Sequence, residues 1–235
     1  MRIGTAGWAL PAADRDAFGP GQSNLARYAT RFSAVEINSS FYRRHRAATW
    51  ARWAAEVPAD FRFSVKAPKL ITHERRLVDC EAPTDEFAAD IAGLGERLAV
   101  VLVQLPPSLA YDEAVADRFF SHLADRTGAR IACEPRHASW FEPDADRHLA
   151  QLEIARVAAD PARVPGAERP GGCSKLAYWR LHGSPVIYRS SYDQEALAAT
   201  AATMSAAPGE AWCIFDNTAS SAAARNGLAL AAIIG

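Results

Sequence analysis

The sequence predicts a (β/α)₈ barrel, in which eight parallel strands, each followed by a crossover connection, close into a ring. Eight short strand-like runs recur along the 235-residue chain, and their ends lie 22 to 38 residues apart. A strand with its crossover helix needs roughly 30 residues, and a whole barrel of this type has about 250. We therefore expect a single barrel domain over residues 1–235. The runs are Arg2–Thr5, Ala34–Asn38, Phe61–Lys66, Leu98–Gln104, Arg130–Glu134, Ile154–Asp160, Ala177–His182 and Ala211–Asp216.

Several runs alternate between an apolar set and a mixed set of side chains, which predicts the face that each set occupies. In the second run Val35 and Ile37 alternate with Glu36, and in the seventh run Trp179 alternates with Arg180. The third and fifth runs follow the same pattern. Because the interface between strands and helices is dry on both sides, we expect the apolar sets to face the helices. The mixed sets should then face the barrel interior.

The connections carry helix and turn signals of unequal strength. Thr84 precedes a predicted helix over residues 85–97, and Asp112 precedes one that runs to Ala124. The connection Pro161–Lys175 contains three prolines and three glycines, which leaves little room for a crossover helix. We therefore expect the barrel to be irregular at the sixth unit.

Composition excludes several classes of protein. The formal net charge is −1, from 26 basic and 27 acidic residues, so no overall charge points to nucleic acid or a membrane surface. The four cysteines are isolated and lack the spacing of metal ligands. No basic and apolar leader precedes the first run, and the apolar segment Leu228–Ile234 is too short to span a bilayer. We expect a cytoplasmic protein with no membrane partner.

Polar side chains gather where the runs end, and the carboxyl ends of barrel strands are where this fold places its chemistry. The alternation predicts that they converge on one bowl. A buried charge without a partner is costly, so the alternative is an ion-pair network that plugs the top of the barrel. The bowl is expected to contain Glu36, Lys66, Gln104, Glu134, Arg136, Asp160, Arg180, His182 and Asp216.

The order of seven short strings resembles one known family. The strings are IGTAGW, VEINSSFY, FSVKAPKLITHERRL, VQLPPSL, EPRHASW, RLHGS and FDNT. Together, from Ile3 to about Ala229, they are similar to the domain-of-unknown-function 72 family (DUF72, YecE-like). The resemblance implies a (β/α)₈ barrel and a site at these strings, and it implies no particular reaction.

Four residues are candidates for catalysis, namely Glu36, Lys66, Glu134 and His182. Glu134 or Glu36, with His182, would move protons. Lys66 is expected to act as an electrostatic clamp or to form a salt bridge with Glu36 or another acid, in preference to acting as a Schiff-base nucleophile. The candidate substrate-binding residues are Trp8, Asn38, Tyr42, Gln104, Arg136, His137, Arg180, Asp216 and Asn217.

Several of these candidates have a structural alternative. Trp8 is either a stacking wall or a lid over the barrel edge, and Tyr42 either covers the bowl or packs on Phe41. His137 is expected to orient Arg136 or Glu134 or to approach a ligand. Trp140 and the loop residue His73 are expected to serve structure more than binding.

The leading hypothesis is a metal-independent enzyme that acts on a small polar anionic molecule, held by Arg136, Arg180 and Lys66 through a phosphate or carboxylate. No cofactor is predicted. One alternative is a non-catalytic binding protein for a sugar phosphate, a nucleotide or a nucleic-acid end, although nucleic acid is not favoured. Another is an isomerase-like or endonuclease-like enzyme that depends on a divalent metal held by Glu36, Glu134, Asp160, His182 and Asp216.

Overall fold

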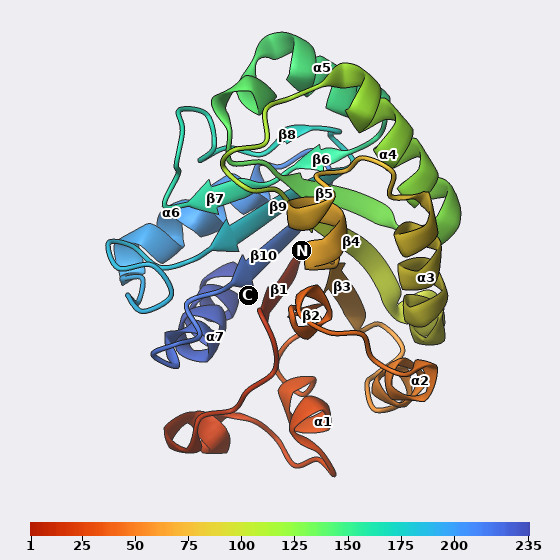
Figure 1. Cartoon of the computed structure of the whole chain (residues 1–235). Coiled ribbons are helices and arrows are strands. Elements are labelled where there is room, and N and C mark those ends of the chain that lie inside the picture. The colour runs from red at the N-terminus through yellow and green to blue at the C-terminus, as the bar shows by residue number, and fades with distance from the viewer.

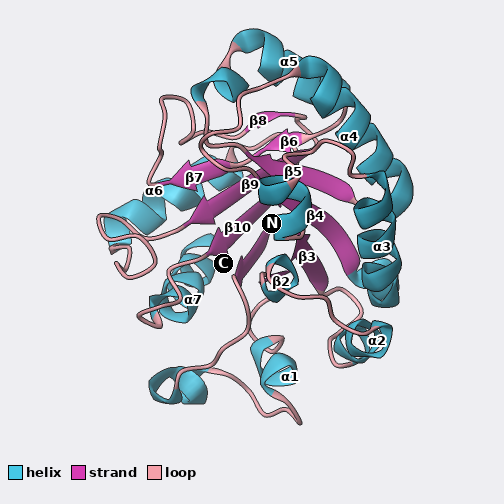
Figure 2. Ribbon diagram, viewed as in Figure 1, coloured by secondary structure: helices cyan, strands magenta, loops and turns pink.

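The protein, described here by a computed structural model of residues 1–235, is a barrel of parallel strands surrounded by helices (Figures 1 and 2). The strands are β1 (Arg2–Thr5), β2 (Ala34–Ile37), β3 (Arg62–Lys66), β4 (Leu98–Gln104), β5 (Arg130–Glu134), β6 (Ala155–Arg156), β7 (Ala158–Asp160), β8 (Gly171–Gly172), β9 (Leu176–Leu181) and β10 (Glu210–Phe215). Their pairing gives two sheets, with the orders β1-β10-β9-β7 and β2-β3-β4-β5-β6-β8. Only the pair between β6 and β8 is antiparallel.

The expected sixth strand joins the two sheets, because its halves pair with different neighbours. Ala155 and Arg156 in β6 pair with β5, whereas β7 pairs with β9. The run Ile154–Asp160 is thus divided at Val157. With β6 and β7 taken as one position, the ring has the eight positions expected, and the prediction of a (β/α)₈ barrel with an irregular sixth unit is confirmed.

The ring closes between β1 and β2, where a glycine allows two backbones to approach closely. Ala6 and Glu36 form a parallel bridge, and the amide of Gly7 donates to the carbonyl oxygen of Glu36 at 2.8 Å. A Cβ atom on Gly4 would lie 2.2 Å from the carbonyl oxygen of Ala34, so that only glycine fits there.

Two separate apolar layers pack on the two faces of the barrel wall. The outer layer, between strands and helices, includes Val65, Trp179 and Phe215. The interior layer includes Tyr178 and Trp212, whose rings stack with centroids 5.9 Å apart. The expected assignment of the alternating sets to helix-facing and interior positions is therefore confirmed for the second, third, fifth and seventh runs. Above the interior layer, toward the carboxyl ends of the strands, the side chains become polar.

Helices cover the outside of the ring (Figure 1), and no helix is long and apolar enough to cross a membrane. Asp112 precedes α4 as expected and caps it, with its carboxylate accepting from the amide of Val115 at 3.0 Å. The helix expected after Thr84 instead starts at Glu81 and ends at Ile91, and a separate 3₁₀ turn follows. The helices are α1 (Asn24–Tyr28), α2 (Ala47–Ala55), α3 (Glu81–Ile91), α4 (Glu113–Thr127), α5 (Pro143–Gln151), α6 (Gln194–Ser205) and α7 (Ala222–Ile234).

The connection between β7 and β9 contains no crossover helix, as its prolines and glycines indicate. Its residues form β8, which pairs with β6, and a loop held by Arg156. The Arg156 guanidinium donates to Asp146 at 2.7 Å and to the carbonyl oxygen of Gly166 at 3.1 Å, and it stacks on the Phe141 ring at 4.6 Å. Side-chain contacts therefore replace a helix in covering this side of the barrel.

Candidate active site at the carboxyl ends of the strands

Side chains from four strand positions meet in a buried network at the carboxyl ends of the strands. The ends of parallel barrel strands lie at one mouth, so residues far apart in sequence come together there. We call this group the Arg180 network, and its members are Glu36, Glu134, Arg180, His182 and Asp216.

Arg180 lies at the centre of the network and bonds to three carboxylates. Its guanidinium donates to Glu36 at 2.7 and 3.0 Å, to Glu134 at 2.6 Å and to Asp216 at 3.0 Å. Arg180 and Glu36 are both 0% exposed. Removing such charges from water costs several kcal/mol per ion, which only close pairing offsets. Although burial alone would lower it, the three carboxylates raise the pKa of Arg180 well above its ordinary value.

Two buried hydroxyls beneath the network complete the hydrogen bonding of Glu36. The Tyr178 hydroxyl lies 3.0 Å from a Glu36 carboxylate oxygen and 2.9 Å from the Ser64 hydroxyl oxygen. Sequence reasoning did not single out Tyr178 or Ser64 as part of the site. Both belong to the interior-facing sets of their strands, two residues before Arg180 and Lys66, and that signal would have found them.

Glu134 accepts hydrogen bonds from four side chains. Gln104 donates to both carboxylate oxygens at 2.9 and 3.0 Å, Arg136 donates at 3.1 Å, and Arg180 and His182 complete the set. Burial alone would raise its pKa, but Arg180, His182 and Arg136 hold the pKa of Glu134 well below its usual range. Glu134 is therefore a permanent carboxylate at neutral pH.

His182 is held between two carboxylates. Its Nδ1 lies 3.0 Å from Asp216 and its Nε2 lies 3.2 Å from Glu134. Burial opposes a charge on the ring, yet Glu134 and Asp216 outweigh it and raise the pKa of His182 above its ordinary value. Asn38 reaches the same network by a long contact of 3.4 Å from its amide to Asp216. The geometry favours an imidazolium with both N–H groups engaged.

Lys66 lies beside the network but is not part of it. Its side chain is 7% exposed, its ammonium lies 4.3 Å from the centre of the Phe41 ring, and no carboxylate oxygen lies within 4.0 Å of it. The expected salt bridge to Glu36 is therefore wrong, because Arg180 already occupies that carboxylate. Burial, together with Arg180, lowers the pKa of Lys66 to about 8, against the opposing pull of the three carboxylates.

The mouth above Lys66 is electropositive. His73 packs edge-on against Phe41, with ring centroids 5.1 Å apart. Burial lowers the pKa of His73, and the charges of Lys66, Arg136 and Lys69 lower it further. Lys66 and Arg136 thus bring positive charge to one small region of the barrel mouth, whereas the charge of Lys69 is balanced by Glu74 at 3.3 Å. Such positive charge raises the local concentration of anions.

The expected bowl is filled with side chains. Glu36 and Arg180 are completely buried, and thus do not line an open cavity. A cavity of about 20 Å³ remains beside Glu134, Arg136 and His182, with Tyr188 also in its wall. Such a volume holds about one water molecule. Arg180 and Glu36 therefore pack as the alternative prediction stated, as an ion-pair network that plugs the barrel.

Asp160 does not point into the barrel as expected. Its carboxylate accepts a hydrogen bond from the Tyr192 hydroxyl at 2.6 Å, and Tyr192 packs on Phe215 in the outer apolar layer. In this strand the neighbours Val157 and Ala159 face the interior side, so Asp160 takes the outward position. The alternation runs unbroken through the run, because Ala155 and Val157 lie in the interior layer and Ile154 and Ala158 in the outer one. The sequence-based interpretation therefore assigned the wrong set of this run to the interior.

Two further candidates, His137 and Asn217, stabilise loops through hydrogen bonds to the backbone. The Nδ1 of His137 accepts from the amide of Ser139 at 3.2 Å and thereby caps the short helix Ala138–Phe141, away from Arg136 and Glu134. The amide of Asn217 donates to the carbonyl oxygen of Ser190 and to Asn226, at 2.9 and 2.8 Å. Neither residue contacts the Arg180 network.

The two aromatic candidates lie at the rim. Tyr42 is 79% exposed and packs edge-on against Phe41, with centroids 4.9 Å apart. Trp8 packs edge-on against Trp53 at 5.0 Å and, with Asn38, lines an open groove of about 420 Å³. Trp140 is buried and donates to the carbonyl oxygen of Leu109 at 2.9 Å, as its structural interpretation requires.

The acidic residues do not fit a divalent cation in this arrangement. The position that a metal would take between Glu36, Glu134 and Asp216 is filled by the Arg180 guanidinium, which bonds to all three. No group of three or more histidine, cysteine, aspartate or glutamate side chains is arranged to hold a metal ion.

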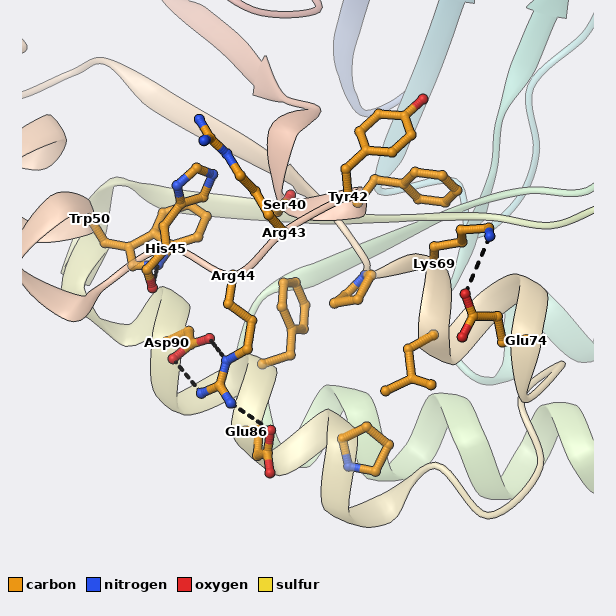
Figure 3. A pocket seen from close by; sticks show the side chains of 15 residues that line it. Ser40, Tyr42, Arg43, Arg44, His45, Trp50, Lys69, Glu74, Glu86 and Asp90 are labelled. Carbon is orange, nitrogen blue, oxygen red and sulfur yellow. Dashed lines mark hydrogen bonds and ion pairs between the residues drawn. The ribbon is translucent and has the colours of Figure 1, made fainter.

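The largest cavity lies outside the barrel interior, and sequence reasoning did not find it. It has a volume of about 480 Å³ and lies between the loop after β2 and the segment after β3, where Arg44, Lys69 and Asp90 stand at its edge (Figure 3). Neither Lys66 nor a member of the Arg180 network lines it. Its walls come from two loops and from the helices α2 and α3, and no alternation of side chains predicts such a meeting.

Comparison with known proteins identifies relatives of this chain. The family model described as "Protein of unknown function DUF72" matches residues 2–235. The UPF0759 protein YecE of Escherichia coli K12 is 30% identical over 157 residues, which cover 64% of this chain and 56% of that relative.

Two solved structures of DUF72 family proteins share the fold. One, from Enterococcus faecalis, has a TM-score of 0.83 at 21% identity and covers 99% of this chain and 94% of its own. The other, from Thermotoga maritima, has a TM-score of 0.81 at 23% identity, with coverage of 99% and 98%. At these identities the likeness establishes the fold.

Proposed function

The chain belongs to the DUF72 family of proteins of unknown function, and we propose that it is a metal-independent enzyme acting on a small, polar, anionic molecule. The substrate carries a phosphate or carboxylate group, which binds at the barrel mouth. This proposal extends to a cytoplasmic location, which is supported by four cysteines that are all free thiols.

The unpaired ammonium of Lys66 carries the proposal. A buried cation without a carboxylate partner costs free energy, and its lowered pKa of about 8, against an ordinary value of 10.5, corresponds to roughly 3 kcal/mol. A folded protein retains such a cost where function requires it. An anionic ligand at this position would restore the missing partner and repay that cost on binding.

Arg136 is the second anion-binding group. Its side chain is 16% exposed, and it uses Nε and Nη2 to contact Glu134, which leaves Nη1 for a ligand. A guanidinium and an ammonium on opposite sides of one small anion provide both charge and direction. Arg180, expected earlier to touch the substrate, instead fixes the carboxylates that orient these groups.

Proton transfer is assigned to the pair Glu134 and His182. Both line the small cavity beside Arg136, and the imidazole reaches Glu134 directly at 3.2 Å. His182 in its protonated form would act as the general acid, with Glu134 stabilising the charge that it carries. Asp216 supports this pair through its direct contact with His182, and Glu36, which is completely buried, supports it through Arg180.

Calorimetric titration with inorganic phosphate, matched in ionic strength with chloride, tests the proposal. We expect one phosphate per chain and at least a tenfold loss of affinity in Lys66→Met. Lys69→Met is the control, because Lys69 is half-exposed and already paired with Glu74. Unchanged phosphate affinity in Lys66→Met would refute the assignment.

Turnover separates the enzyme from the non-catalytic alternative. An enzyme should convert at least one member of a panel of phosphate- and carboxylate-bearing metabolites, and His182→Asn should abolish that conversion while phosphate still binds. Binding without conversion by any panel member, together with a salt-dependent affinity for oligonucleotides, would favour the binding protein.

A further inference from the structure

The cavity between the loop after β2 and the segment after β3 has an apolar floor. Trp50 and Phe87 are 1% and 4% exposed and form its base, while Leu70 is 43% exposed at its edge. Phe41 and two prolines complete the apolar part of the wall. At about 480 Å³ the cavity has the size of pockets that bind small molecules, which measure about 300–1,000 Å³.

Most of the charged side chains around this cavity are paired with one another, and the exposed Arg43 is the exception. Arg44 binds Asp90 through two hydrogen bonds of 2.7 and 2.9 Å and Glu86 through one of 2.7 Å (Figure 3). Lys69 and Glu74 form a second pair at 3.3 Å. The rim therefore offers no carboxylate that is free to bind a cation.

The formal charge of the lining is zero. Arg43, Arg44 and Lys69 balance Glu74, Glu86 and Asp90. The remaining ionisable ring is His45, and burial together with Arg43 lowers its pKa below the ordinary value, so that it is neutral at pH 7. This balance contrasts with the excess of positive charge around Lys66.

We propose that this cavity is a binding site for an uncharged, mainly apolar molecule that contains a ring. Phe41, Trp50 and Phe87 would contact the ring, and the balanced charges at the rim would give an ion no net attraction. The site goes beyond the proposed anion site and does not depend on it. The two sites adjoin, because Phe41 lines this cavity and also contacts the Lys66 ammonium.

A pair of fluorescent probes that differ in one charge tests the class of ligand. N-phenyl-1-naphthylamine is uncharged, and 8-anilino-1-naphthalenesulfonate has the same rings with an added sulfonate. We expect the uncharged probe to bind the folded chain at one site, with at least tenfold higher affinity than the sulfonate at that site. Equal or tighter binding of the sulfonate in competition with the uncharged probe would overturn the assignment.

Two matched variants test the location. Leu70→Glu places a charge on the lining at an exposed position and should weaken binding of the uncharged probe at least tenfold. Val78→Glu is the control, because Val78 is similarly exposed at 45% but does not line the cavity. Thermal melts of both variants verify folding, and if Leu70→Glu does not fold, Pro83→Glu replaces it, because Pro83 is a partly exposed lining residue in the first turn of α3.

Binding of the uncharged probe should not depend on the anion site. Probe affinity should be unchanged in Lys66→Met, and phosphate should not displace the probe. Probe binding that survives both Leu70→Glu and Pro83→Glu would refute the proposed location, whereas loss of phosphate binding alone would leave it intact.

Discussion

Glu134 and His182 lie 3.2 Å apart through a carboxylate oxygen and Nε2, although 48 residues separate them in the sequence. The contact exists because β5 and β9 end at the same mouth of the barrel. Because the unfolded chain lacks this contact, protonation of the imidazole contributes to the free energy of unfolding.

His182 should make stability decrease as the pH rises. Its pKa is raised in the folded protein, so its contribution is fully present below the unfolded value of about 6.5 and is lost as the pH passes the folded value. The free energy of unfolding of the wild type minus that of His182→Asn should therefore shrink between pH 5.5 and pH 9. A difference that stays constant or grows over this range would contradict the protonated state.

Lys66 should make stability increase as the pH rises, which is the opposite of the effect of His182. Its folded pKa is about 8 against an ordinary value of 10.5, so the unfolded chain binds more protons between these values and stability rises with pH there. At pH 7, Lys66→Met should increase the free energy of unfolding by about 2–3 kcal/mol. Denaturant titration measures it, and Lys69→Met, a change on the surface, should stay within about 0.5 kcal/mol. A destabilised Lys66→Met protein would mean that Lys66 has a stabilising partner.

Glu134→Gln should destabilise the fold. The new amide would place a donor toward other donors, and Arg180 would lose one of three carboxylates. Breaking a buried pair costs about 3–5 kcal/mol, and for a chain of this size each kcal/mol lowers Tm by about 2–4 °C. The control Glu210→Gln, at the opposite end of the barrel, removes partly exposed pairs with Arg2 and Arg130 and should cost about 1–2 kcal/mol. An equal, small effect in both variants would show that the Arg180 network is not a structural support.

Asp160→Asn should leave phosphate binding unchanged. Asp160 contacts Tyr192 in the outer layer, so the variant weakens one hydrogen bond to a charged group and costs about 1.5–3 kcal/mol of stability. Calorimetry and thermal melts measure the two effects separately. A tenfold loss of phosphate affinity would return Asp160 to the site.

The sequence predicts the fold well because the barrel rests on local patterns. Alternating runs such as that around Glu36 specify both a strand and its inward face, and the strand ends then bring Glu134 and His182 to one mouth. The patterns do not show how the long side chains pack together and fill the mouth of the barrel. Arg180 occupies the space that an open bowl requires, and it takes the carboxylate expected for Lys66.

Other features depend on breaks and loops that lack a periodic pattern. In the sixth run the mixed set that ends at Asp160 faces the outer layer, because the small apolar residues Ala155 and Val157 fill the interior instead. The capping role of His137 follows from the turn at Ser139 and not from the strand before it. The 480 Å³ cavity arises where two loops meet the side of α3, which only a three-dimensional arrangement reveals.

The pairing of Glu36 with Arg180 also constrains the order in which the chain matures on the ribosome. The two residues are 144 positions apart, which at about 5–20 residues per second separates their synthesis by roughly 7–30 s. Until Arg180 emerges, a buried Glu36 carboxylate would lack its partner, which is costly in free energy. The first half of the nascent chain must therefore leave this carboxylate hydrated. The interior of the barrel therefore cannot exclude water while β9 is still being translated.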